Sequence, residues 1–227
     1  MASGKLPAMS ERIEAEKRAA ARAAAQLVRD GMRVGLGTGS TVAHLLPALA
    51  ERRLRDVRCV ATSPATEALA IELGLAVEPF DAVDRLDIAV DGADQVAPDG
   101  WLIKGGGGAH TREKVVAAAA DRFVVIVSSD KDVAVLRPPV PLELLAFGLA
   151  ATLRALGGAR LRDAPPSPDG GVIADLDEPF DDPAAHAARL AATPGVVEHG
   201  LFGPALVSDV LIARGEEVEH RRVAPRA

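Results

Sequence analysis

Up to residue 131, short apolar runs alternate with longer segments of helical periodicity. The apolar runs cover residues 32–36, 57–61, 75–78, 86–90 and 123–127. The helical segments cover residues 10–29, about 41–54, 64–74 and 111–121. Alternating strands and helices are typical of a parallel sheet, and strands that are apolar throughout indicate helices on both faces. The pattern predicts an α/β fold with a doubly wound parallel sheet.

Residues at the predicted helix boundaries support this division. Ser10 can cap the first helix, and Gly31 lies just past its end. Pro64 suits the first position of the third helix, and Thr111 can cap the fourth.

The pattern changes after Arg137, where Pro138, Pro139 and Pro141 mark a boundary. We expect a helix over 142–156, a strand, a Pro/Gly loop over 165–171, a strand over 172–176, a helix from Asp182 and a strand over 196–198. This order predicts a small α+β insertion, after which residues 206–213 return to the main sheet. The sequence shows no internal repeat and no low-complexity tract.

Composition excludes several classes of protein. The 227 residues are 48% hydrophobic, which is enough for one substantial core or two unequal ones. The net charge of −6, without a Lys/Arg-rich tract, is unlike that of a nucleic-acid-binding protein. One cysteine allows no intrachain disulfide, and no apolar run predicts a signal peptide or a membrane span. We expect a cytoplasmic protein.

Polar segments follow four of the predicted strands. These segments are residues 37–41, 62–63, 91–94 and 128–131. Open α/β sheets bind ligands outside the carboxyl ends of their strands, so all four should meet at one edge. Their convergence predicts the position of a site more firmly than any single motif does.

The run from Lys104 to Lys114 holds four consecutive glycines followed by Glu113. Glycines cost backbone entropy and pack no side chain, so a fold tolerates four where another group must approach the backbone. A lysine cation at one end and a glutamate at the other suit an anionic substrate that loses a proton. The alternatives are a lysine that is simply exposed to solvent and a glutamate that occupies the first turn because the helix dipole favours negative charge there.

The segment Gly37-Thr38-Gly39-Ser40-Thr41 lies between a strand and a helix. Its amides and hydroxyls could bind phosphate at the positive end of the helix. Its spacing matches neither the P-loop nor the dinucleotide fingerprint. The alternative is a tight turn in which Ser40 or Thr41 caps the helix.

Asp91 and Asp94 bracket Gly92 and Ala93 at a strand end. Two carboxylates so close repel, so one could keep a proton at neutral pH and relay protons to hydroxyls. A single metal site or an Asp-rich turn are the alternatives.

The other candidate groups carry weaker signals. Lys131 ends a strand-end loop and is a candidate phosphate ligand, whereas Lys17 fits a solvated helix face better. The five histidines show no ligand spacing and are expected to be structural or exposed; Cys59 is expected to be buried in its strand.

Five stretches together resemble one known family. They are Gly35-Leu36-Gly37-Thr38-Gly39-Ser40-Thr41, Asp91-Gly92-Ala93-Asp94, Lys104-Gly105-Gly106-Gly107, Thr111-Arg112-Glu113-Lys114 and Gly200-Leu201-Phe202. In order and spacing, from about residue 10 to 213, the chain resembles ribose-5-phosphate isomerases of the A type. That resemblance implies a Rossmann-like catalytic domain over 1–136 and 205–227, and a small α+β, ferredoxin-like domain over 137–204.

The resemblance also implies a function and a set of site residues. The family interconverts ribose 5-phosphate and ribulose 5-phosphate in the pentose phosphate pathway, without a metal or other cofactor. Glu113 would be the base that moves a proton between C2 and C1, and Asp91, Asp94 and Lys104 would open the sugar ring and stabilise the oxyanion. The implied substrate-binding residues are Thr38, Gly39, Ser40, Thr41, Asp91, Gly92, Ala93, Asp94, Lys104, Gly105, Gly106, Gly107 and Lys131. A homodimer is the expected assembly, with a tetramer as the alternative.

The sequence departs from the family pattern at a few positions. Gln95, Gly108 and His110 replace residues that are more usual there, and the end beyond Gly203 matches poorly. None of these is an expected catalytic residue. Other activities compatible with such a fold are a related sugar-phosphate isomerase or amino-sugar deaminase, a sugar-phosphate sensor without enzymatic activity and, more distantly, a CoA-transferase.

Overall fold

A six-stranded sheet forms the larger part of the molecule in the computed structural model, which describes residues 9–83 and 85–223. Its strands are β1 (Arg33–Leu36), β2 (Arg58–Ala61), β3 (Ile88–Asp91), β6 (Phe123–Ser128), β12 (Asp209–Arg214) and β13 (Glu217–Arg222). They lie in the order β13-β12-β6-β3-β1-β2, and all neighbours are parallel except β12 and β13. The predicted α/β fold with a parallel sheet is confirmed.

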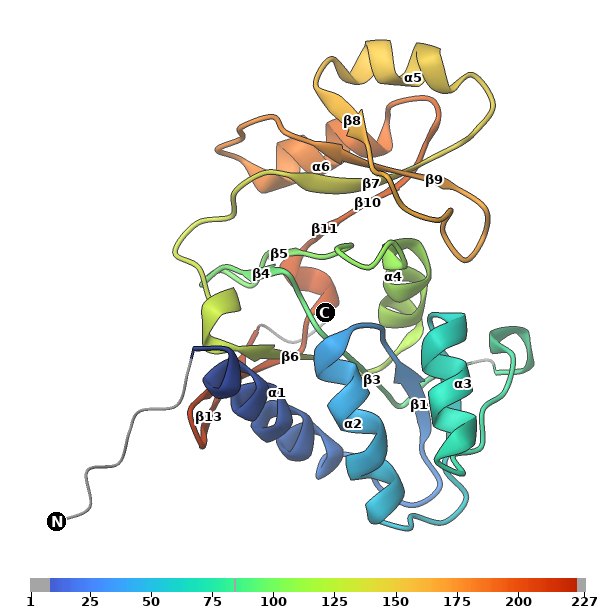
Figure 1. The fold of residues 1–227 in the computed structure, drawn as a ribbon, viewed down its shortest axis with the longest axis vertical. Helices are drawn as coiled ribbons and strands as arrows, with labels where there is room; N and C mark the ends of the chain where they lie inside the picture. Colours follow the sequence, from blue (N-terminus) through green and yellow to red (C-terminus); the bar gives the residue numbers. More distant parts are fainter. Residues whose placement is uncertain (1–8, 84, 224–227) are drawn as a thin grey trace, which may run out of the picture.

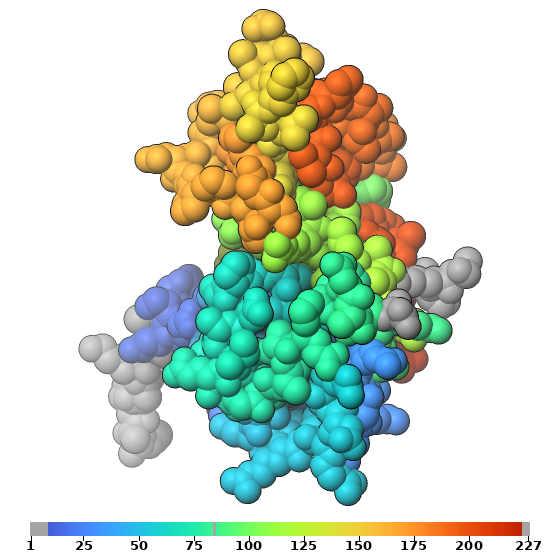
Figure 2. Space-filling model, turned by 90° about the vertical axis from the view of Figure 1, so that its right-hand side faces the viewer, coloured from blue at the N-terminus to red at the C-terminus, as the bar shows by residue number. Residues whose placement is uncertain are grey.

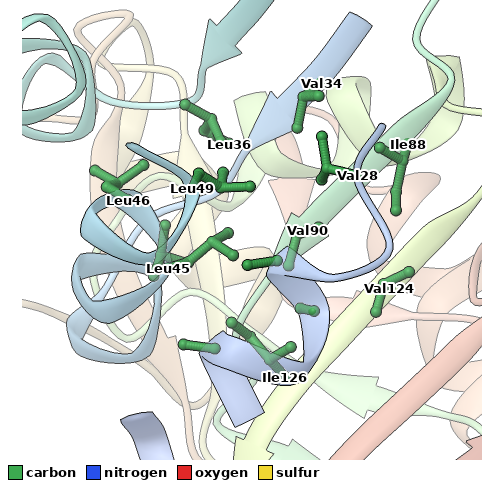
Figure 3. Close-up of a cluster of buried hydrophobic side chains, with 14 of the residues drawn as sticks. Val28, Val34, Leu36, Leu45, Leu46, Leu49, Ile88, Val90, Val124 and Ile126 are labelled. Carbon is green, nitrogen blue, oxygen red and sulfur yellow. The ribbon is translucent and has the colours of Figure 1, made fainter. Parts of the chain in front are cut away.

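Helices cover both faces of this sheet (Figure 1). On one face, α1 (Met9–Ala25), α2 (Ser40–Glu51) and α3 (Pro64–Glu72) share a core with the strands. Figure 3 shows this core, where Leu45, Leu46 and Leu49 of α2 face Val34, Leu36, Val90 and Ile126 of the strands. On the other face, α4 (His110–Ala119) packs Val116 and Ala117 against the alternate strand residues, including Val125 and Val127.

A three-stranded sheet lies between the core beneath α4 and a third hydrophobic core. It consists of β4 (Gln95–Val96), β5 (Leu102–Ile103) and β11 (Leu201–Phe202), in the order β11-β5-β4. Successive strand residues point to opposite faces. Leu102 and Phe202 therefore belong to the core beneath α4, whereas Ile103 and Leu201 belong to a third core.

The third core lies under a four-stranded antiparallel sheet, hereafter the small sheet. Its strands are β7 (Val140–Leu144), β8 (Ala159–Leu161), β9 (Val172–Leu176) and β10 (Val196–His199), in the order β10-β7-β9-β8. Two helices, α5 (Leu149–Leu156) and α6 (Pro183–Ala191), complete this part. Figures 1 and 2 show it stacked on the larger part, and the chain returns through β11 and a short helical turn (Pro204–Leu206) to β12. A domain division at 137 and 204 stays a prediction.

The helix predicted over 142–156 is wrong in its first part. Residues 140–144 form β7, and a helix begins only at Leu149. Val140, Leu142 and Leu144 all enter the third core, and the buried carboxylate of Glu143 lies on the other side. The alternation of residues between the two sides is typical of a strand. It is hard to recognise in the sequence, because the leucines and alanines that follow favour a helix.

Several boundaries also differ from those predicted. The first helix begins at Met9, so Ser10 lies inside it, and it ends at Ala25 instead of near Arg29. Thr111 lies in the first turn of α4, whose N-cap is Ala109, and its hydroxyl donates to Glu143 Oε2 instead of capping the helix. Residues 75–78 form only an isolated bridge, Val77 with Cys59, and β4, β5, β11 and β13 were not predicted.

Other local predictions are confirmed. Pro64 opens α3, and Ser63 accepts a hydrogen bond from the Thr66 N–H. Pro183 opens α6, whose N-cap Asp182 accepts from two backbone N–H groups. Cys59 is buried in β2. Across residues 9–83 and 85–223, none of the helices combines the length and the apolar character needed to span a bilayer.

Candidate active site

A pocket of about 230 Å³ opens at the carboxyl ends of the main-sheet strands. It lies beyond β1, β3 and β6, where the sequence placed three of the four polar segments. Its lining comprises Ile13, Lys17, Thr38, Gly39, Ser40, Thr41, Gly92, Ala93, Asp94, Lys104, Gly105, Gly106, Gly107, Glu113, Asp130 and Lys131. Segments far apart in the chain meet here because parallel strands end at the same edge.

Lys104, Asp91 and Glu113 form a buried cluster at this pocket. The Lys104 Nζ atom lies 3.0 Å from Asp91 Oδ2 and 3.0 Å from Glu113 Oε2. It also donates to the Gly92 carbonyl at 2.5 Å, and none of the three charged side chains is more than 5% exposed. One ammonium among two carboxylates leaves a net negative charge away from water, which favours retention of a proton.

The electrostatics of the cluster follow from its burial. Burial and the charge of Asp91 raise the pKa of Glu113 to about 8, although Lys104 opposes the shift. Burial also raises the pKa of Asp91, again against Lys104. For Lys104, burial lowers the pKa, but the two carboxylates outweigh it and raise the pKa above its ordinary value. The lysine therefore stays charged while the carboxylates hold protons more tightly than usual.

Asp91 lies behind the pocket and not among its lining residues. Its Oδ1 atom accepts the N–H groups of Thr38 at 3.1 Å and Gly92 at 2.7 Å. A Cβ atom at Gly37 would lie 2.0 Å from the Asp91 carboxyl, so only glycine fits there. The glycine after β1 thus makes room for the carboxylate that ends β3 and supports Lys104.

Asp94 has a different environment from its neighbour. It is half-buried, lines the pocket, and accepts the Gly106 N–H at 2.8 Å through Oδ2. A Cβ atom at Gly106 would lie 2.7 Å from Asp94 Oδ1, so a larger residue would push the carboxylate away. The two aspartates predicted as a pair therefore occupy separate positions, one behind Lys104 and one against residues 105–108, hereafter the glycine loop.

The loop after β1 offers polar groups to the pocket. Helix α2 begins at Ser40, and its N-cap Gly39 makes no side-chain capping bond. The alternative in which Ser40 or Thr41 caps the helix is therefore wrong, since both lie within its first turn. Together with the first-turn N–H groups, their hydroxyls line the pocket at the N-terminus of the helix, a position whose N–H groups and dipole favour negative charge.

Two lysines line the same pocket. Lys131, in the turn after β6, pairs with Asp130 at 3.1 Å, and Lys17 of α1 pairs with Glu14 at 2.6 Å. The Lys17 side chain is only 15% exposed, so the interpretation as a solvated helix face is wrong. Ile13, which also lines the pocket, was not predicted, and Asp130 lies in the predicted polar segment 128–131 but was not singled out as a site residue. Ile13 and Lys17 lie four residues apart on one helix face, which is the signal that could have found them.

The remaining titratable residues lie outside this arrangement. His110 is buried and burial lowers its pKa to about 4, while His44 lies 3.0 Å from Glu14. Within residues 9–83 and 85–223, no three His, Cys, Asp or Glu side chains are grouped so that they could hold a metal ion. The polar groups of the pocket are instead carboxylates, ammonium groups, hydroxyls and backbone amides.

Known proteins resemble this chain in sequence and in structure. Residues 58–217 match the family model of ribose 5-phosphate isomerase A (phosphoriboisomerase A). A ribose-5-phosphate isomerase A of Nitrobacter hamburgensis is 47% identical, over 92% of this chain and 99% of its own. A solved D-ribose-5-phosphate isomerase in complex with phospho-erythronic acid superposes with a TM-score of 0.88 at 36% identity, over 92% of this chain and 99% of its own.

A second solved structure gives the same picture. The ribose 5 phosphate isomerase A of Neisseria gonorrhoeae superposes with a TM-score of 0.89 at 30% identity, and the match covers 93% of this chain and 98% of the other. The matches thus extend over all three sheets and almost the whole length of the relatives. The chain belongs to the ribose 5-phosphate isomerase A family.

Proposed function

We propose that this chain is an aldose–ketose isomerase that interconverts D-ribose 5-phosphate and D-ribulose 5-phosphate through an enediolate. The observation that carries the proposal is the contact of Glu113 with Lys104 in a pocket that also presents a phosphate-binding helix start. A proton next to a carbonyl is only weakly acidic. Its removal needs a positioned base and a cation that meets the developing charge.

Glu113 is the proposed base. It takes the proton from C2, the electrons of that C–H bond form the C1=C2 double bond, and the carbonyl π electrons move onto O1. The same carboxyl then returns the proton to C1. A pKa raised to about 8 makes Glu113 a stronger base than an ordinary carboxylate, with a proton affinity matched to neutral solution.

Lys104 is the proposed stabiliser of the oxyanion. Its ammonium group is fully charged and lines the pocket beside Glu113. The negative charge appears first on O1, and a proton passes from the O2 hydroxyl to O1 before C1 is protonated. Because Lys104 and Glu113 are almost fully buried, an ammonium held in place stabilises this charge more than solvent would.

The two aspartates have separate proposed roles. Asp94 lines the pocket and accepts the proton of the anomeric hydroxyl of the cyclic sugar. O1 then becomes the carbonyl oxygen as the bond between C1 and the ring oxygen breaks, and Asp94 returns the proton to the ring oxygen. Asp91 acts from behind, where it holds Lys104 in place and in its charged form. The role of Asp91 depends on its burial and on the charge of Lys104, which together set its proton affinity.

The phosphate is proposed to lie at the start of α2. Thr38, Gly39, Ser40 and Thr41 supply hydroxyl and amide donors, and Lys131 and Lys17 supply positive charge. Gly92, Ala93, Gly105, Gly106 and Gly107 line the remaining wall and let the sugar approach closely. The complex of one solved relative with phospho-erythronic acid supports a sugar phosphate as the class of substrate, since that ligand is a phosphorylated four-carbon sugar acid whose carboxylate resembles an enediolate.

The cofactor use, assembly, cellular location and pathway of the enzyme are further expectations. We expect it to act without a metal or other cofactor, as a homodimer, in the cytoplasm and in the non-oxidative pentose phosphate pathway. Family membership supports these expectations. Light scattering of the purified protein tests the homodimer, with a monomer or a tetramer as the contradicting results.

An isomerase assay tests the function directly. Purified protein should form ribulose 5-phosphate from ribose 5-phosphate, and activity should persist in a chelator. The same assay with other pentose, hexose and amino-sugar phosphates tests the alternative isomerase and deaminase activities. Absence of turnover with ribose 5-phosphate, or higher kcat/KM with an amino-sugar phosphate, would contradict the proposal.

A further inference from the structure

The glycine loop is held from two sides by side chains of different parts of the fold. The Gly105 carbonyl accepts a hydrogen bond from Arg162 Nη1 at 2.9 Å, and the Gly106 N–H donates to Asp94 Oδ2 at 2.8 Å. These two groups belong to the same trans peptide unit and point in opposite directions. The peptide is therefore held at both ends, and its orientation also sets that of the Asp94 carboxylate.

Arg162, which directly follows β8, uses its guanidinium to join the loop to the small sheet. The same Nη1 atom donates to the Gly106 carbonyl at 3.0 Å. Nε and Nη2 pair with the two carboxylate oxygens of Asp175 in β9. A planar guanidinium can hold a carboxylate on one edge and backbone oxygens on the other, which an ammonium cannot do in the same way.

The loop needs such a support. Its residues are glycines, and Gly105 and Gly108 have φ values of +114° and +72°, in the region where only glycine is at ease. A glycine segment has many accessible conformations, so its position depends on outside contacts. Arg162 does not line the site pocket, whereas Gly105, Gly106 and Asp94 do, so the arginine reaches the site only through the loop.

The helix that carries Glu113 is joined to the same small sheet. Thr111 donates to Glu143 of β7, and Lys114 donates to Glu198 of β10 at 2.7 Å. Arg112 pairs with Asp169, in the loop between β8 and β9. The small sheet therefore holds both the glycine loop and the base, so a change at Arg162 should move one relative to the other.

We propose that Arg162 is a positioning residue for the proton transfer, which it serves by fixing the glycine loop through the carbonyls of Gly105 and Gly106. The inference rests on the proposed isomerase function. It adds a residue from the small sheet to a site whose other groups come mainly from the carboxyl edge of the main sheet.

Arg162→Met in the full-length protein tests the inference, with Arg160→Met as the matched control. Arg160 lies in β8, pairs with Asp177 at 2.9 Å with its side chain 74% exposed, and has no hydrogen bond to the glycine loop. We expect Arg162→Met to lower kcat roughly 10- to 100-fold, since a small displacement of reacting groups costs this much. KM should change less than about threefold, because the phosphate is held at other strand ends.

A substrate deuterated at C2 separates slower chemistry from loss of folded enzyme. We expect the isotope effect on kcat in Arg162→Met to equal or exceed that of the wild type, because breakage of the C2–H bond is the impaired step. Circular dichroism gives the folded fraction of each variant. Asp175→Asn, which keeps the arginine but weakens its support, should lower kcat in the same direction by a smaller factor.

Four results would overturn the inference. They are a kcat within about twofold of the wild type in Arg162→Met, an equal loss in Arg160→Met, a loss that matches the fall in folded fraction, and a smaller isotope effect. If Arg162→Met does not fold, an unchanged kcat in Asp175→Asn overturns it. A wild-type protein without isomerase activity would instead refute the proposed function.

Discussion

The Nζ atom of Lys104 lies 3.0 Å from Oε2 of Glu113, with both side chains almost fully buried. Lys104 precedes the glycine loop and Glu113 lies in the first turn of α4, which follows the loop, so the path of the loop brings a cation and a carboxylate together. In this contact the lysine stays charged and the glutamate holds its proton more tightly than an exposed carboxyl does. The proposed base and the proposed stabiliser of the oxyanion are thereby adjacent before substrate arrives.

Glu113→Gln should lower kcat about 10³-fold, because the amide keeps the shape of the side chain but accepts no proton. KM should change little, since the phosphate contacts are untouched. Steady-state kinetics with ribose 5-phosphate measures both. Glu67→Gln is the matched control, since Glu67 is also a first-turn helix glutamate but is exposed. Near-normal turnover in Glu113→Gln would refute its role as the base.

The pH dependence of kcat/KM should report the raised pKa of Glu113. The base acts only when deprotonated, so log kcat/KM should rise with pH at a slope near one and level off near pH 8. A profile that is already flat between pH 5.5 and 8, as for a carboxylate of ordinary pKa, would contradict the assigned environment. The measurement is the initial rate at low substrate concentration in constant-ionic-strength buffers.

Lys104→Ala should destabilise the fold by about 3–5 kcal/mol at pH 8, since it leaves two buried carboxylates without their cation. A carboxyl whose pKa is raised in the folded state binds protons more tightly than in the unfolded chain. The free energy of unfolding therefore falls as pH rises from 4.5, the ordinary pKa of a glutamate, through the raised pKa of Glu113 in the folded state. The loss should be smaller at pH 5 than at pH 8, as measured by urea unfolding.

The same variant should lower kcat as well as weaken binding, because Lys104 is proposed to act mainly on the oxyanion. A pure rise in KM would indicate uniform binding of substrate and transition state instead. Lys131→Ala serves as the control for stability, since its lysine is half-exposed and pairs with only Asp130 among the acidic groups of the described residues. An equal loss of stability in both variants would argue against the buried cluster.

Lys131→Ala and Lys17→Ala should each raise KM for ribose 5-phosphate about tenfold, with less than about threefold change in kcat, since a charge-assisted bond to phosphate contributes roughly 1.5 kcal/mol. Both effects should shrink as ionic strength rises. Steady-state kinetics at two salt concentrations measures this. A large loss of kcat with unchanged KM in either variant would place that lysine at the reacting carbons instead of the phosphate.

Local patterns predicted most of the main sheet, because its parallel strands are mainly apolar and its helices carry clear start signals such as Ser63-Pro64. They failed at β7, where Leu142 and Leu144 precede a helical stretch and only the third core shows which residues are buried. They also failed at Thr111, whose hydroxyl bonds to Glu143, more than thirty positions away. Partners so distant in sequence leave no local signal.

The sequence by itself determined the fold class and most of the chemistry-bearing groups of the pocket, since residue types, spacing and strand-end positions are local properties. Only the tertiary structure decided how these groups are arranged: Asp91 lies behind Lys104, Lys17 turns into the pocket, and Arg162 reaches the glycine loop from the small sheet. Burial, which raises the pKa of Glu113, likewise depends on how distant segments pack around it.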